Sequence, residues 1–148
     1  MGVSAKNFFS EQDKEKIVNA IKEAEKNTSG EIRVHIENKC PGDPVERALY
    51  WFGKLKMHET ELRNGVLFYL AVKSRKFAII GDEGINKAVP DDFWEKIKEN
   101  MAMHFRKGEF AQGLTEGILE AGEALKKYFP YQKDDVNELS DDISFGKN

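Results

Sequence analysis

Two apolar runs in the middle of the chain define the centre of the predicted fold. Val66 to Val72 is an unbroken apolar run, which is typical of a strand buried on both faces. The polar turn Lys73–Arg75 leads directly into a second apolar run, Phe77 to Ile80. This connection is too short for a crossover, so the pattern predicts an antiparallel hairpin.

An earlier segment, Glu31 to Glu37, alternates strictly between apolar and polar residues. Such alternation predicts a half-buried strand, which we expect near an edge of the sheet with Arg33, His35 and Glu37 on its polar face. A helical pattern separates this strand from Val66–Val72. A right-handed strand–helix–strand crossover then makes the two strands parallel neighbours in one sheet.

Four amphipathic helices are predicted around these strands. The first helix has its N-cap at Ser10, and the second begins at Pro44. The third begins at Pro90–Asp92 and ends at Gly108, and the fourth spans about residues 110 to 128. The second helix should turn Val45, Leu49, Phe52 and Leu55 inward. In the last helix, Gly113 and Gly117 predict a smooth patch for close approach of a neighbouring backbone. The fold class is therefore α/β, a three-layer α/β/α sandwich with a small mixed central sheet flanked by about four helices.

The composition changes near residue 130. We expect residues 1–130 to form a single domain and residues 131–148 to form an acidic, largely disordered tail with five acidic residues. The alternative is that Leu139, Ile143 and Phe145, which lie near helical spacing, dock as a short segment on the domain or on a partner.

Charge and cysteine content narrow the classes of function. The 148 residues include 23 basic and 26 acidic side chains, interspersed, with a net charge of −3. There is no basic stripe, which argues against nucleic-acid binding. No apolar run reaches the ~20 residues of a membrane span, and the start of the chain lacks the apolar core of a signal peptide, so we expect a cytoplasmic protein. The only cysteine is Cys40, which excludes an intrachain disulfide and a cysteine metal cluster.

The predicted topology gathers polar residues at one end of the sheet. Two strand starts and one strand end should meet there, and the turn that follows should bring the start of the third helix above the same edge. Carboxylates, an amide and loop carbonyls form a set of hard oxygen ligands suited to Ca²⁺ or Mg²⁺. Crowded carboxylates repel one another, and a divalent cation relieves that repulsion. The candidate metal ligands are Asp82, Glu31, Asp91, Asp92, Asn64 and Glu83.

Each of these residues also has a structural interpretation. Asp82 and Glu83 could close a turn, Asp91 and Asp92 could cap a helix, and Glu31 could be an exposed strand-start residue. The three histidines share no metal-ligand spacing, and the chain has no nucleophile elbow, phosphate-binding loop or zinc pattern.

The sequence resembles the TPM domain family. The resemblance is carried by five segments in the family's order: Ser29–Val34, Arg63–Leu67, Gly81–Ile85, Pro90–Trp94 and Phe105–Leu114. It implies a three-layer α/β/α domain with an acidic divalent-cation site. The plant member of the thylakoid lumen is described as an acid phosphatase tied to photosystem II repair, and many bacterial members are exported and membrane-anchored.

The chain departs from the family at Arg63, where the family often has an aspartate directly before Asn-Gly-Val-Leu. This change removes one carboxylate and places a cation beside the remaining acids. It argues against phosphatase activity in particular. Because the acidic residues have no evident nucleophile–base pair beside them, we expect a cation-binding accessory module with an unidentified protein partner or phosphorylated ligand. The alternative is a metal-dependent phosphatase, in which Arg63 would bind the phosphate.

Overall fold

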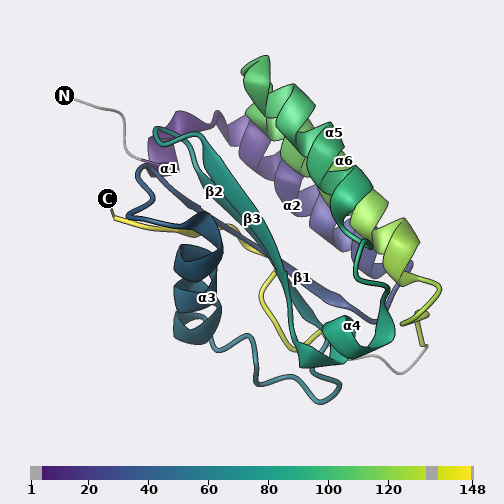
Figure 1. The fold of residues 1–148 in the computed structure, drawn as a ribbon. Helices are drawn as coiled ribbons and strands as arrows, with labels where there is room; N and C mark the ends of the chain where they lie inside the picture. Colours follow the sequence, from purple (N-terminus) through teal and green to yellow (C-terminus); the bar gives the residue numbers. More distant parts are fainter. Residues whose placement is uncertain (1–4, 133–136, 148) are drawn as a thin grey trace.

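The computed structural model describes residues 5–132 and 137–147 (Figure 1). Its elements in chain order are α1 (Ala5–Phe8), α2 (Glu11–Glu25), β1 (Glu31–Glu37), α3 (Pro44–Lys54), β2 (Gly65–Ala71), β3 (Lys76–Gly81), α4 (Glu83–Ala88), α5 (Glu95–Arg106), α6 (Phe110–Leu125) and β4 (Ser144–Phe145).

The strands form one mixed sheet in the order β3-β2-β1-β4. β1 and β2 are parallel, with Glu31 opposite Gly65, and β2 and β3 are antiparallel, with Val66 opposite Gly81. The predicted hairpin and crossover are both confirmed. The starts of β1 and β2 and the end of β3 therefore meet at one end of the sheet, as the sequence predicted.

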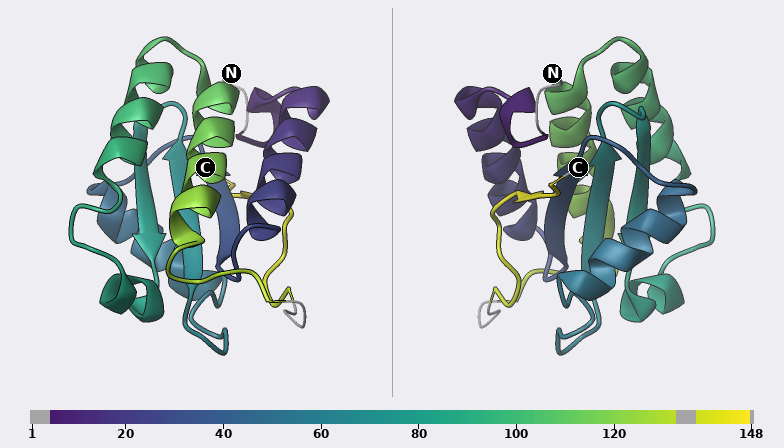
Figure 2. Two further views of the ribbon diagram at one scale, coloured as in Figure 1. Left: turned by 90° about the vertical axis from the view of Figure 1, so that its right-hand side faces the viewer. Right: turned by 90° about the vertical axis from the view of Figure 1, so that its left-hand side faces the viewer.

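Helices cover both faces of the sheet, which confirms the three-layer α/β/α fold (Figure 2). α2, α5 and α6 lie on one face, where Val34, Phe68 and Ile118 belong to the larger core. α3 lies on the other face, where Phe52 and Tyr69 belong to a smaller core. The short helix α4 lies at the end of the sheet where β1 and β2 begin (Figure 1).

The inward face predicted for α3 is wrong in part. Phe52 is buried and Leu55 is half-buried, but Val45 and Leu49 are 47% and 51% exposed, and Ala48 is buried in their place. α3 crosses a narrow sheet and contacts it mainly through β2 and β3, so its buried stripe is narrower than the apolar pattern suggests.

Two other helix predictions need correction. α5 begins at Glu95, because residues 91–94 form a turn after Pro90. The Asp82–Gly84 segment does not simply close a turn; Asp82 is the N-cap of α4, a helix that the sequence did not predict. Gly108 ends α5 with a φ of +78°, as predicted.

The expected exposed face of β1 is also wrong. β1 lies between β2 and β4, and His35 and Glu37 are both fully buried. The smaller core covers this face, so the polar side chains of His35 and Glu37 are buried beneath it.

The expected disordered tail is wrong for residues 137–147. We call these residues the C-terminal strap. Its strand β4 pairs with β1, with Ser144 opposite His35 and Phe145 opposite Ile36. Leu139 is buried in the smaller core, and Ile143 and Phe145 pack against the larger one. The structure therefore agrees with the alternative in which Leu139, Ile143 and Phe145 dock on the domain. Residues 133–136 and 148 of the predicted tail lie outside the described residues.

Candidate functional site

Asp82, the central residue of the predicted metal site, is held by an arginine. Its carboxylate accepts hydrogen bonds from Arg63 Nε at 2.8 Å and Arg63 Nη2 at 3.0 Å. Asp82 Oδ1 also accepts the backbone N–H of Glu83 at 2.8 Å, which caps α4. The guanidinium lies 3.3 Å from the Glu83 carboxylate as well. Arg63 therefore supplies the positive charge that a metal ion would otherwise bring to these two acids.

Asn64 joins the starts of two strands. Its side-chain Nδ2 donates to the carbonyl of Ser29 at 3.0 Å, and its own carbonyl accepts the backbone N–H of Glu31 at 3.1 Å. The side chain is almost fully buried. This geometry gives Asn64 a structural role at the mouth of the sheet, where the sequence analysis placed a neutral oxygen donor.

Glu31 attaches the C-terminal strap to the domain. Its Oε1 accepts the backbone N–H of Glu138 at 2.5 Å and of Leu139 at 2.8 Å. Burial raises the pKa of Glu31 to about 7, although these two hydrogen bonds act in the opposite direction. The carboxyl group of Glu31 thus changes its charge close to neutral pH.

Two further acids lie beside Glu31. Glu25, in the last turn of α2, accepts the backbone N–H of Ile32 at 3.1 Å. Burial raises the pKa of Glu25 to about 9, and a hydrogen bond with the carboxyl group of Asp141 adds to the rise. The negative charges of Asp141 and Glu31 raise it further. Three carboxyl groups from α2, β1 and the strap are therefore close enough to influence one another.

These three acids line an open pocket of about 250 Å³. Asn137 is also in its wall and donates from Nδ2 to Asp141 Oδ1 at 3.1 Å. Lys22 and Lys26 form the basic part of the wall. The pocket thus combines carboxyl and amide oxygens, the ligands that hard cations prefer. We call Glu25, Glu31, Asn137 and Asp141 the strap pocket.

Sequence reasoning found Glu31 but missed the other members of the strap pocket. A signal for Glu25 was present, since it lies four and eight residues after Ile21 and Ile17 and therefore on the buried stripe of α2. Asp141 had no such signal. It was placed in a tail expected to be disordered, and its contact with Glu25 spans more than a hundred residues.

The six predicted ligands do not all gather in one place. Asp82 and Glu83 contact Arg63, Glu31 contacts the strap, and Asp91 and Asp92 are exposed in the turn before α5. Within residues 5–132 and 137–147, no three His, Cys, Asp or Glu side chains are already arranged to hold a metal ion.

A second buried polar network lies under α3. The Glu37 carboxylate accepts Arg47 Nε at 2.7 Å and Arg47 Nη2 at 2.9 Å, and it also accepts the hydroxyl of Tyr69. Burial alone would raise the pKa of Glu37, but the hydrogen bonds from Arg47 and Tyr69 outweigh it and hold the pKa below its ordinary value. The buried charge is compensated, which is typical of a structural network.

Comparisons with known proteins agree with this architecture. The family model of the TPM domain matches residues 3–124, which is most of the chain. The chain belongs to the TPM domain family. No curated protein matches it.

Among solved structures, this TPM domain is similar to the BA42 protein of the psychrophilic bacterium Bizionia argentinensis. The two are 50% identical, with a TM-score of 0.89 over 94% of this chain and 96% of that one. Two more distant structures share the fold alone. The N-terminal domain of a P. gingivalis protein is 22% identical, with a TM-score of 0.67 over 82% and 78% of the two chains. The N-terminal domain of the cg2496 protein of Corynebacterium glutamicum is 14% identical, with a TM-score of 0.61 over 92% and 80%.

In the part of this TPM domain that the structure describes, none of the helices has both the length and the apolar character needed to cross a bilayer.

Proposed function

We propose that this TPM domain is a divalent-cation-binding accessory module and that its cation, Ca²⁺ or Mg²⁺, binds in the strap pocket. The observation that carries the proposal is that Glu25, Glu31 and Asp141 line one open pocket, where Asp141 helps to raise the pKa of Glu25. A cation would replace the protons that these groups otherwise retain, and it would remove the repulsion between their charged forms.

The proposal keeps Glu31 from the sequence-predicted ligands and adds Glu25 and Asp141. Asp82 and Glu83 stay outside it because both carboxylates are already paired with Arg63. Binding in the strap pocket would join α2 and β1 to the strap through one ion, since Asp141 belongs to the strap. Cation binding would therefore stabilise the docked strap, in the same way that any ligand stabilises the state that binds it.

The test is a titration of the uniformly ¹⁵N-labelled protein with CaCl₂ and with MgCl₂, followed by amide chemical shifts at constant ionic strength. We expect saturable shifts around residues 25, 29–31 and 137–141. The double variant Glu25→Gln, Asp141→Asn should lose them. The matched control, Asp91→Asn with Asp92→Asn, removes the same number of carboxyl groups from exposed positions and should keep them. An unchanged response in the strap-pocket variant, or shifts confined to residues 82–92, would refute the proposed site.

The alternative function, metal-dependent hydrolysis of phosphoesters, gains no support from Arg63. This is the residue that could bind a phosphate, and its guanidinium is engaged by Asp82 and Glu83. We expect no saturable hydrolysis of p-nitrophenyl phosphate with either cation. Saturable activity that is lost in Asp82→Asn, with the fold intact, would favour the phosphatase instead.

A further inference from the structure

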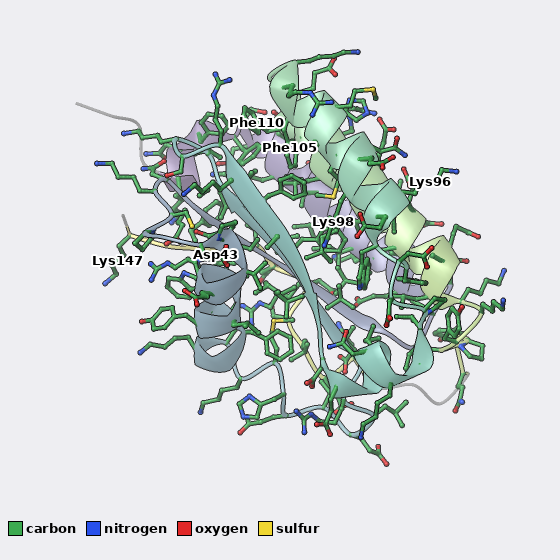
Figure 3. All side chains as sticks on the ribbon, viewed as in Figure 1. Asp43, Lys96, Lys98, Phe105, Phe110 and Lys147 are labelled. Carbon is green, nitrogen blue, oxygen red and sulfur yellow. The ribbon has the colours of Figure 1, made fainter. Side chains whose placement is uncertain are left out.

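A second pocket lies far from the strap pocket, where the β2–β3 hairpin meets α5. Its volume is about 230 Å³, and its floor is apolar. The rings of Phe77 and Phe105 meet edge to face at 5.0 Å, and those of Phe105 and Phe110 stack at 5.5 Å. Figure 3 shows Phe105 and Phe110 close together beside α5. Leu70 and Ala102 complete the apolar lining, so we call this the phenylalanine pocket.

Two arginines stand at the edge of the phenylalanine pocket. Arg75 lies in the hairpin turn, and Arg106 is the last residue of α5. Both residues are exposed. Within the described part of the chain, neither guanidinium makes a hydrogen bond or an ion pair, whereas Arg47 and Arg63 each bind a carboxylate through two nitrogens.

The absence of acids at this pocket is notable because acids outnumber bases in the chain, 26 to 23. The described residues that line the phenylalanine pocket include two arginines and no acid. An apolar floor beside two available guanidinium groups is complementary to an anion with an apolar body. A guanidinium also fits a carboxylate in a planar, two-bond arrangement that a lysine cannot reproduce.

We propose that the phenylalanine pocket binds a small carboxylate with a compact aromatic body. The ring of the ligand would pack on Phe105 and Phe110, and its carboxylate would accept hydrogen bonds from Arg75 and Arg106. The volume lies below the roughly 300–1,000 Å³ of typical ligand pockets, which excludes nucleotides and long-chain lipids. For a ligand of this size in an open pocket we expect a Kd on the order of 0.1–1 mM. This inference is independent of the cation site.

The experiment uses 3-phenylpropionate as the probe and amide chemical shifts of the full chain as the readout. Shifts should appear around residues 70, 75–77 and 102–110 and should saturate. The neutral isostere 3-phenylpropionamide should bind at least fivefold more weakly, since it keeps the ring and loses the charge. Arg75→Gln and Arg106→Gln are exposed substitutions that should keep the fold, and each should weaken binding of the acid about fivefold or more without affecting the amide. Lys87→Gln on α4 is the matched control and should change neither affinity.

Three results would overturn this proposal. The first is equal affinity for the acid and the amide, which would show that the arginines do not contribute. The second is unchanged binding in both arginine variants. The third is a response that is absent at 10 mM probe or is confined to another surface, such as the groove that Phe93 and Leu119 line between α5 and α6. Ala102→Leu provides a further check, because it should fill the pocket and abolish the shifts while the arginines remain.

Discussion

Arg63 donates two hydrogen bonds to Asp82, from Nε at 2.8 Å and from Nη2 at 3.0 Å. Asp82 is 7% exposed, so its charge is largely removed from water and needs a partner. The pairing with Arg63 balances the charge of Asp82 within the protein, without a metal.

The first prediction follows from this pair. Asp82→Asn should lower the free energy of unfolding by about 1–3 kcal/mol, because it leaves a guanidinium with a weaker acceptor while asparagine still caps α4. Urea denaturation at pH 7 measures the loss. The response of the strap pocket to Ca²⁺ should not change, since Asp82 lies outside it. Asp91→Asn, an exposed control, should change stability by less than about 0.5 kcal/mol. A stability loss in the control equal to that in Asp82→Asn would contradict this account.

The second prediction concerns the C-terminal strap. A chain that ends at Gln132 should unfold at a lower temperature by roughly 5–15 °C, because it loses the burial of Leu139, Ile143 and Phe145, worth about 2–4 kcal/mol. Thermal unfolding followed by circular dichroism gives the number. The single change Leu139→Ala should show part of this loss, while Ser140→Ala at an exposed position should show almost none. A truncated chain that melts within about two degrees of the full chain would support the disordered tail that composition suggests.

The strap shows which parts of this fold can be predicted from sequence. Val66–Val72 and the turn after it define a hairpin through local signals alone, and helix and strand order then fixes the parallel pairing of β1 with β2. The strap has no such local signal. Its order comes from contacts such as Ser144 with His35, which join residues more than a hundred positions apart. Composition cannot reveal contacts of this kind.

The candidate site was predictable to a similar extent. Strand topology placed Glu31, Asn64 and Asp82 at one end of the sheet, and the register confirms that the three backbone segments meet there. Where each side chain points depends on its partners. Asp82 pairs with Arg63, and Glu31 binds the strap. The two side chains therefore have different partners, although their backbone segments are neighbours.

The third prediction uses the pH dependence of stability through His35. Its ring stacks on Trp51 at 3.8 Å, and its Nδ1 lies 2.8 Å from the hydroxyl of Ser144. Burial lowers the pKa of His35 to about 4; Glu37 acts against this change, and Arg47 and Arg33 add to it. The unfolded chain therefore binds this proton more readily than the folded one. The contribution of neutral His35 to the free energy of unfolding is fully present above about pH 6.5 and is lost as the pH falls towards about 4.

A comparison of variants isolates this contribution from that of the carboxyl groups. At pH 7.5, His35→Gln should be less stable than the wild type, because it loses the ring stack with Trp51. Between pH 7.5 and pH 4.5 that deficit should shrink by on the order of 1–3 kcal/mol, since only the wild type carries the unfavourable protonation. Urea denaturation of both proteins across this range tests it, with His58→Gln at an exposed loop position as the control. A deficit that is constant with pH would show that protonation of His35 does not limit stability.

The last prediction separates two glycines of α6 by what they contact. A Cβ at Gly122 would lie 2.7 Å from Ala24 Cβ and 2.8 Å from Ala24 Cα, so α2 and α6 would have to move apart. A Cβ at Gly117 would lie 2.5 Å from Met101 Sδ, and a flexible methionine can change rotamer. The sequence analysis assigned close backbone approach to Gly113 and Gly117, but in the structure Gly122 makes that contact.

Gly122→Ala should therefore lower the free energy of unfolding by about 1–3 kcal/mol, because overpacking between two helix backbones has no local relief. Gly117→Ala should cost less, since the side chain of Met101 can change rotamer where the backbone of Ala24 cannot. The gain of about 0.5–1 kcal/mol in helix propensity is the same at both sites. Urea denaturation of the two single variants and of Gly117→Ala with Met101→Leu measures the difference. Because the two sites lie in one helix and receive the same substitution, helix propensity is matched between them, and only the neighbouring atoms differ. Equal costs, or a larger cost at Gly117, would mean that side-chain repacking at Met101 is harder than separating α2 from α6.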